Sequence, residues 1–255
     1  MWQETQGPSA DAARGQANHS FCRPSRYCAA SFGFQSAENP GAPLGSLRAL
    51  LEGKEAEIDG RRLTLSTAGG PVPVYLAASQ PRMLRLAGEL ADGVIVLGIA
   101  EPEFTRQQVA LVRDGAREAG RPPGEPFVDL WVTVSVGADR AAALDDVRSW
   151  ASTQARWIAQ WKTIPPPLQP YAEEIRAAAA AYDFGEHLSL RARHGRTVSD
   201  GFTGTIAVAG DREACAARLK ALAGTGVDRL TVTLLSGGRA DRLRVLCDEV
   251  FPAVA

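Results

Sequence analysis

The sequence predicts an α/β fold in which helices cover a parallel sheet. Its strand-like segments, such as PVPVYLAA (71–78) and DGVIVLG (92–98), are continuous apolar runs, as expected for strands buried on both faces. Each run leads into a segment whose apolar residues recur with helical spacing, so strands and helices alternate along the chain. A Rossmann sheet and a βα barrel both fit this alternation. The dinucleotide-binding Rossmann version loses support because no G-x-G-x-x-G follows any strand.

The first part of the chain is expected to contain an irregular segment, then one helix and one β-hairpin. Residues 1–42 mix Ser, Ala, Arg, Gly and Pro without an apolar period, so we expect them to be disordered or irregular. At Pro43 the run PLGSLRALLEG places its leucines on one helical face and ends at Gly53. The pair Asp59-Gly60 then separates two short β-type runs, which predicts a hairpin.

The βα pairs follow in order. We expect strand 71–78 with helix 81–91, strand 92–98 with helix 102–120, strand 126–137 with helix 139–152, then, after a longer excursion, helix 211–226, strand 226–235 and a terminal helix over 240–254.

Composition places the chain among ordinary globular proteins. Its 255 residues, near the ~250 of a complete barrel, are 45% hydrophobic and 22% charged, with a net charge of -1. This balance gives no reason to expect a nucleic-acid partner. No apolar run reaches the roughly 20 residues that span a membrane, and the N-terminus lacks the features of a signal peptide. We therefore expect a cytoplasmic protein.

The cysteines and histidines do not form a metal-binding pattern. The cysteines are Cys22, Cys28, Cys215 and Cys247, and the histidines are His19, His187 and His194. No CxxC pair is present, so we expect no metal site and give Cys22 and Cys28 no role. Cys215 and Cys247 lie in apolar helical patterns and are expected to be buried thiols.

Three segments resemble one enzyme family. The run PVPVYLAASQPRMLRLAGELADGVIVLG (71–98) is similar to strands five and six of the bacterial-luciferase-like flavin and deazaflavin oxidoreductases. The segments YDFGEHLSL (182–190) and VAGDREACAARLKALAGTGVDRLTV (208–232) resemble the same family's segment before strand eight and its last barrel helix and strand. The order and spacing agree, and the subgroup similar to methylenetetrahydromethanopterin reductases resembles the chain most.

This resemblance implies a fold and a function. Residues 43–255 would form the C-terminal half of a TIM (β/α)8 barrel, strands five to eight with their helices, and strands one to four have no counterpart in the chain. The family implies an oxidoreductase that uses coenzyme F-420 or FMN for hydride transfer or monooxygenation of a small-molecule substrate. A half-barrel could pair with a second copy as a homodimer. The alternative is a non-catalytic truncated remnant or an interaction module.

The resemblance also points to the loop after strand 71–78, the fifth strand of the family's barrel. A barrel's active site lies at the C-terminal ends of its strands. The loop Ala77-Ala78-Ser79-Gln80 resembles a loop that in the family contacts the cofactor's phosphate, and Ser79 matches a phosphate-binding serine. The helix that follows would favour a phosphate at its N-terminus. Alternatively, Ser79 is an N-cap ahead of Pro81. Gln80 stands where the family commonly has glycine.

Later strand ends offer weaker candidates. Leu97-Gly98 matches a loop beside the cofactor, where Gly98 permits either close approach of a ligand or a purely steric turn. Ser236-Gly237-Gly238 could form an anion-binding nest or only a turn. His187 lies in a region where family members contact substrate, although a lone histidine is more often a surface residue.

No catalytic residue is assigned, because no carboxylate pair, serine triad or metal cluster stands out at the strand ends. The family leaves the chemistry to its cofactor. Trp150, Trp157 and Trp161 share a helical spacing and are expected to pack in a core or against a partner.

Overall fold

The computed structural model describes residues 28–29, 41–67, 69–235 and 237–254. The chain divides into two compact units, residues 1–72 and 73–255. Most of the segment expected to be irregular, including Cys22, lies outside the described residues. The sequence-based boundary after residue 42 therefore stays a prediction.

The first unit contains the expected helix and hairpin. Its elements are β1 (Cys28–Ala29), α1 (Ala42–Leu51), β2 (Ala56–Ile58) and β3 (Arg61–Leu63). β2 and β3 pair antiparallel around Asp59 and Gly60, whose φ angles are 50° and 72°. Two consecutive residues with positive φ are the requirement of a tight type I′ turn, which explains the Asp-Gly pair.

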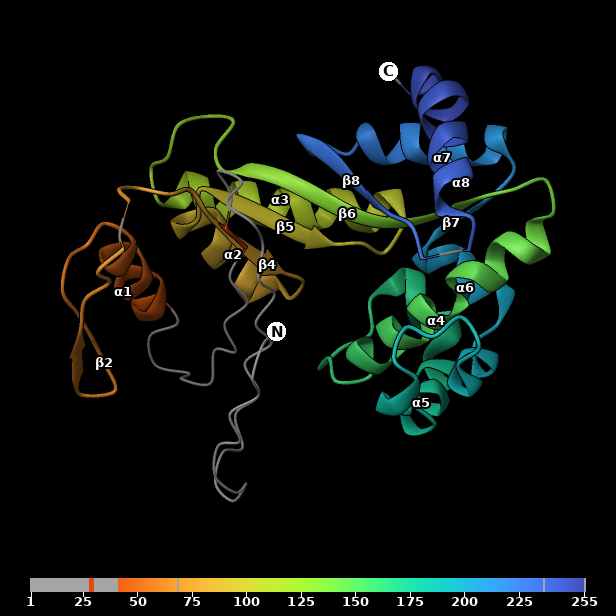
Figure 1. The fold of residues 1–255 in the computed structure, drawn as a ribbon, viewed down its shortest axis with the longest axis horizontal. Helices are drawn as coiled ribbons and strands as arrows, with labels where there is room; N and C mark the ends of the chain where they lie inside the picture. The colour runs from red at the N-terminus through yellow and green to blue at the C-terminus, as the bar shows by residue number, and fades with distance from the viewer. Residues whose placement is uncertain (1–27, 30–40, 68, 236, 255) are drawn as a thin grey trace, which may run out of the picture. The chain divides into compact units, whose positions relative to one another are not determined.

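The second unit carries the alternating strands and helices (Figure 1). Its elements are β4 (Val74–Ala78), α2 (Pro81–Leu90), β5 (Gly93–Leu97), α3 (Pro102–Glu118), β6 (Phe127–Val136), α4 (Arg140–Ile158), a 3₁₀ turn (Pro166–Tyr171), α5 (Ala172–Ala180), two 3₁₀ turns (Phe184–Glu186 and Arg193–Thr197), α6 (Asp200–Ile206), β7 (Val208–Gly210), α7 (Arg212–Ala223), β8 (Arg229–Thr233), α8 (Arg239–Val245), a π turn (Leu246–Val250) and a last 3₁₀ turn (Phe251–Ala253).

The strands of the second unit form a parallel sheet in the order β4–β5–β6–β8. The long strand β6 pairs with β5 along Phe127–Trp131 and with β8 along Asp129–Thr133, and its last residues pair with the short strand β7. The sheet order follows the chain order without reversal, as in a segment of a barrel, whereas a Rossmann sheet reverses at its switch point.

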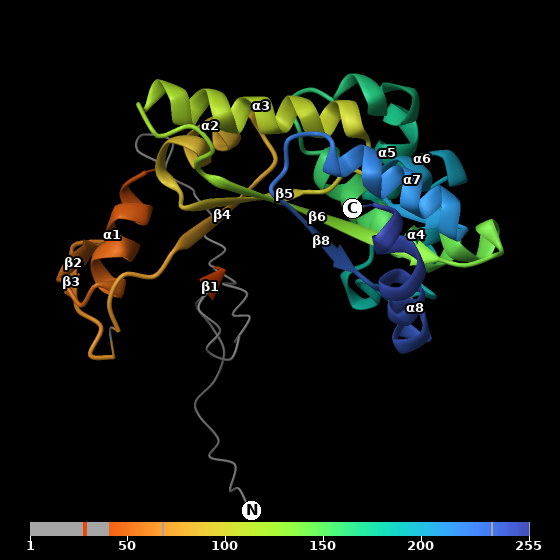
Figure 2. The same cartoon turned by 90° about the horizontal axis from the view of Figure 1, so that it is seen from above.

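One face of the sheet is covered by α2 and α3 (Figure 2). Alternate strand residues such as Val74, Leu76, Val94 and Val128 are buried. The two helices approach each other through glycines. A Cβ on Gly88 would lie 2.0 Å from a carbonyl oxygen of α3, and a Cβ on Gly115 would lie 2.0 Å from one of α2. Only glycine fits at either position, so α2 and α3 contact each other backbone to backbone.

The opposite face of the sheet carries a polar cluster around Asp129, which is 1% exposed. The Asp129 carboxylate accepts hydrogen bonds from Arg229 (Nε 3.0 Å, Nη2 2.5 Å), from the Thr231 hydroxyl (2.8 Å) and from the Trp131 indole (3.2 Å). These donors come from β8 and β6, so the cluster joins the two strands by side chains as well as by the backbone ladder.

A helical segment between β6 and β7 packs on the loop after β5. Ile99 and Phe104 share a buried cluster with residues of α4, α5 and α6, and the amide of Ala100 donates to the carbonyl of Ile206 (3.1 Å). Figure 1 shows these helices grouped at the end of the sheet to which β5 and β6 point. The segment therefore adjoins the C-terminal end of the barrel strands.

The three tryptophans do not share one helix as expected, because α4 ends at Ile158 and Trp161 lies beyond it. Trp150 and Trp161 pack against the buried cluster, which confirms core packing for these two. Trp157 is 50% exposed, with the Arg156 guanidinium 5.0 Å from its ring. Core packing is therefore wrong for Trp157, and packing against a partner stays a prediction.

One of the two cysteines expected to be buried is exposed. Cys215 is fully buried and its thiol contacts the carbonyl of Ser135 (3.8 Å), whereas Cys247 is exposed. Cys247 lies in the π turn, whose buried residues are Leu246 and Val250. The wider turn changes the helical phase that the apolar pattern assumed, so the prediction for Cys247 is wrong.

Candidate functional site

The loops after β4 and β5 lie next to each other because their strands pair in register, Ala78 opposite Val96. The first loop continues Ala77 and Ala78 into Ser79 and Gln80, and the second follows Leu97 with Gly98. Ala77 is exposed while Ala78 is buried, so the strand presents Ala77 on the face that α2 does not cover. The structure thus brings together the residues that the sequence assigned to a cofactor loop.

The N-terminus of α2 lacks a side-chain cap. Gln80, not Ser79, is the N-cap residue, and its side chain makes no capping hydrogen bond. The capping interpretation of Ser79 is therefore wrong. The Nε2 atom of Gln80 is buried and has no hydrogen-bond partner among the described residues. A buried donor without an acceptor is rare in folded proteins and indicates a place for an unfilled partner.

The N-terminus of α3 is different, because the protein supplies its own anion there. The Glu101 carboxylate accepts hydrogen bonds from the amides of Glu103 (3.2 Å) and Phe104 (2.6 Å). This cap neutralises the positive end of the α3 dipole. Of the two adjacent loops, the one before α2 is therefore the better position for an external anion.

Gly98 has a structural reason to be glycine. A Cβ at this position would lie 2.2 Å from the carbonyl oxygen of Trp131, and the Gly98 amide donates to the same oxygen (2.9 Å). The steric interpretation of Gly98 accordingly has direct support. Contact of this loop with a cofactor stays a prediction.

At the ends of β6 and β8, Arg242 of α8 joins three elements. Its guanidinium donates to the Ser135 hydroxyl (2.7 Å) and pairs with Asp146 of α4 (2.7 Å). Its Nε also donates to the carbonyl of Gly237 (3.2 Å), and Gly238 has a φ of 62°. The two glycines thus form an anchored turn before α8. Ser236 lies outside the described residues, so the anion nest stays a prediction.

His187 is exposed on the helical segment, and its Nδ1 contacts the hydroxyl of Tyr182, which also contacts the Thr153 hydroxyl (3.1 Å). None of these partners comes from the loops after β4 or β5. His194, which the sequence did not single out, is 2% exposed, and its ring centroid lies 4.3 Å from that of Tyr182. Desolvation lowers the pKa of His194 below its usual value.

Comparison with known proteins identifies the family. The model of the luciferase-like monooxygenase family matches residues 44–229. This chain belongs to that family. Within the luciferase-like family, it is 28% identical over 193 residues to a 5,10-methylenetetrahydromethanopterin reductase of Methanolobus tindarius, covering 73% of this chain and 57% of that one. It is also 37% identical over 114 residues to an F-420-dependent glucose-6-phosphate dehydrogenase of Nakamurella multipartita, covering 44% of this chain and 33% of that one.

A solved structure shares the fold of this chain. The coenzyme F-420-dependent tetrahydromethanopterin reductase of Methanopyrus kandleri superimposes with a TM-score of 0.65 at 21% identity, covering 85% of this chain and 64% of that one. The chain thus spans little more than half the length of the methanopterin reductases it matches, 57% in the Methanolobus tindarius relative.

Two other features bear on function within the described part of the chain. No helix there is both long and apolar enough to cross a membrane. No group of three or more His, Cys, Asp or Glu side chains is arranged to hold a metal ion in the same residues.

Proposed function

We propose that this chain belongs to a luciferase-like oxidoreductase and binds the phosphate of coenzyme F-420 or FMN in the loop after β4. The observation that carries the proposal is the N-terminus of α2, where no side-chain cap is present and the buried Nε2 of Gln80 lacks an acceptor. A phosphate oxygen would supply that acceptor. The relative named as an F-420-dependent glucose-6-phosphate dehydrogenase supports coenzyme F-420 as the cofactor.

The residues present suit a phosphate. The dipole of α2 favours an anion at this end, and half-buried Ser79 adds a hydroxyl donor next to Gln80. Glutamine in place of glycine contributes an amide donor here, so it need not weaken binding. When bound, the cofactor ring supplies hydride transfer or activation of dioxygen, and the chain holds and orients it. The substrate is then a small molecule, for which His187 remains a weak candidate contact.

We further propose that residues 43–255 form strands five to eight of the barrel and that a second copy closes it. Among the described residues β8 pairs only with β6, and its side chains are partly exposed. An unpaired parallel edge favours association. Sedimentation over a range of protein concentrations should show a dimer, and a monomer at all concentrations would contradict this arrangement. A cytoplasmic location remains a prediction from composition.

The alternative is a remnant or interaction module without turnover. The two hypotheses differ in whether the loop after β4 binds a cofactor. Retained binding would support the oxidoreductase.

The test is a fluorescence titration with FMN and with coenzyme F-420. A charge-assisted hydrogen bond contributes about 1.5–3 kcal/mol, so Ser79→Ala and Gln80→Ala should each weaken binding by roughly 10- to 100-fold. Ser66→Ala, an exposed serine of the first unit, is the control and should bind normally. Absence of saturable binding at high micromolar cofactor would refute the proposal, and so would wild-type affinity in both the Ser79→Ala and the Gln80→Ala variants.

A further inference from the structure

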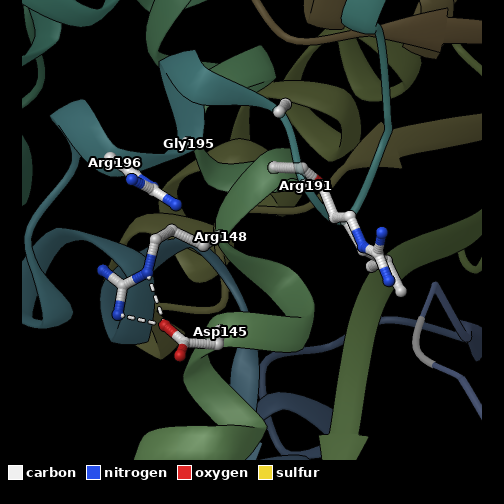
Figure 3. Close-up of a pocket in the computed structure, with 8 residues that line it drawn as sticks. Asp145, Arg148, Arg191, Gly195 and Arg196 are labelled. Atoms are coloured by element: carbon white, nitrogen blue, oxygen red, sulfur yellow. Dashed lines mark hydrogen bonds and ion pairs between the residues drawn. The ribbon is translucent and has the colours of Figure 1, made fainter.

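A pocket of about 630 Å³ lies between α4 and the segment 190–196 (Figure 3). Its lining includes Asp145, Arg148, Ser149, Arg191, Gly195 and Arg196. None of these residues belongs to the loops after β4 or β5. The volume falls within the roughly 300–1,000 Å³ of typical small-molecule sites.

The wall contributed by α4 is fixed by Arg148. Its guanidinium donates to Asp145 (2.9 Å), to Asp200 (2.5 Å) and to the carbonyl of Val198 (2.8 Å). These bonds join α4 to the start of α6 and hold the carboxylate of Asp145 in a neutralising ion pair. Asp145 therefore does not repel an anion as an unpaired carboxylate would.

Two other arginines line the pocket without partners. The guanidinium groups of Arg191 and Arg196 have no hydrogen bond or ion pair among the described residues, and both side chains are exposed. In Figure 3 Arg196 extends toward Arg148, whereas Arg191 lies on the opposite rim and points away. With Asp145 and Asp200 each offsetting one charge, the three arginines leave the pocket net positive, and a guanidinium is the side chain best suited to bind phosphate oxygens.

Ser149 provides a second, independent indication of a ligand. The residue is 3% exposed, and its Oγ is buried with no hydrogen-bond partner among the described residues. A Cβ on Gly195 would lie 3.7 Å from the Ser149 amide, so the opposite wall approaches α4 closely at this serine. An unpaired buried hydroxyl costs about 1–3 kcal/mol, and a ligand acceptor would recover that cost.

We propose that this pocket binds a small organic phosphate monoester, with Arg196 contacting the phosphate, Ser149 donating its hydroxyl and Arg191 turning in from the rim. A dianionic phosphate uses several donors on three oxygens, whereas one arginine satisfies a carboxylate. The volume exceeds what inorganic phosphate needs, which leaves room for the organic group. This site is separate from the cofactor loop and does not depend on it.

Calorimetric titration with phenyl phosphate tests the proposal, with benzoate as the carboxylate comparison. Phenyl phosphate should bind saturably and more weakly as salt increases. Arg196→Gln should weaken it at least about 10-fold and Ser149→Ala several-fold, on the scale of a hydrogen bond to a charged group. Arg61→Gln, an exposed arginine in the first unit, should leave it unchanged.

Two further variants make the result decisive. Ser149→Ala removes an unpaired polar atom, so its Tm should equal or exceed that of the wild type, and any loss of binding is then not a loss of folding. In the Ser79→Ala background, Arg196→Gln should still weaken phenyl phosphate binding, because Ser79 belongs to the loop after β4 and not to this pocket. The proposal is overturned if phenyl phosphate does not bind at millimolar concentration, if benzoate binds as tightly, or if Arg196→Gln has no effect.

Discussion

The buried pair of Asp129 and Arg229 allows an asymmetric prediction. The side chain of Asp129 is 2% exposed, whereas that of Arg229 is 47% exposed. Arg229→Gln leaves a buried carboxylate with only the donors of Thr231 and Trp131. Removing one partner of a buried pair costs about 3–5 kcal/mol, and because these two donors remain we expect about 3 kcal/mol.

The reverse substitution should cost less. Asp129→Asn keeps an oxygen that accepts from Thr231 and leaves the arginine half in water, so we expect about 1–2 kcal/mol, the desolvation cost of one poorly satisfied group. Arg244→Gln, which breaks an exposed ion pair with side chains 72% and 81% exposed, is the control. It should change stability by less than about 1 kcal/mol.

Urea unfolding followed by circular dichroism measures these differences. The double variant Asp129→Asn with Arg229→Gln should be less destabilised than the sum of the single variants, because Arg229→Gln no longer leaves a buried charge. If Asp129→Asn costs as much as Arg229→Gln, or if the two effects add, then burial of the carboxylate is not what makes Arg229→Gln destabilising.

Gly98→Ala should destabilise the protein by about 1–3 kcal/mol through overpacking on the β6 carbonyl, whereas Gly224→Ala, with its nearest contacts at 3.6 and 3.7 Å, should be tolerated; equal Tm values for the two would contradict the clash. Because the pKa of His194 is lowered in the folded protein, the unfolded chain takes up this proton at a higher pH than the folded protein does. The free energy of unfolding should therefore decrease as the pH falls below about 6.5, the ordinary pKa of histidine. Between pH 7.5 and 5.5 the Tm of His194→Gln should decrease less than that of the wild type. If the two Tm values decrease equally, His194 is not the source of this pH dependence. Burial raises the pKa of the Cys215 thiol to about 11, so iodoacetamide at pH 8 followed by peptide mass mapping should modify exposed Cys247 and spare Cys215; rapid labelling of Cys215 in the folded protein would count against its burial.

Local patterns predicted most of the elements, with errors at their ends. The apolar run 71–78 predicted a strand that in fact begins at Val74, because Pro73 cannot donate to a ladder. The helix expected to end at residue 152 continues to Ile158. Its polar continuation is compatible with a helix because Thr153 donates back to the carbonyl of Ser149 (3.0 Å) and Gln154 is buried.

The candidate site was predictable only where it lies within one short segment. The resemblance indicated the loop around Ser79, but the sequence did not show that Gln80 occupies the N-cap position with a buried, unpartnered amide. The Asp129 cluster joins residues 100 positions apart, and the pocket residues Ser149 and Arg196 come from different elements. Spacing rules that extend over three or four residues do not detect such pairs.

The glycine contact between α2 and α3 bears on how the loops after β4 and β5 keep their spacing. The loops after β4 and β5 lead into these two helices, and main-chain atoms at Gly88 and Gly115 set the separation of the helix axes. Exchange of one apolar side chain for another elsewhere on the helices leaves this separation unchanged. The two neighbouring loops can therefore keep a constant spacing when apolar side chains elsewhere on α2 and α3 are exchanged.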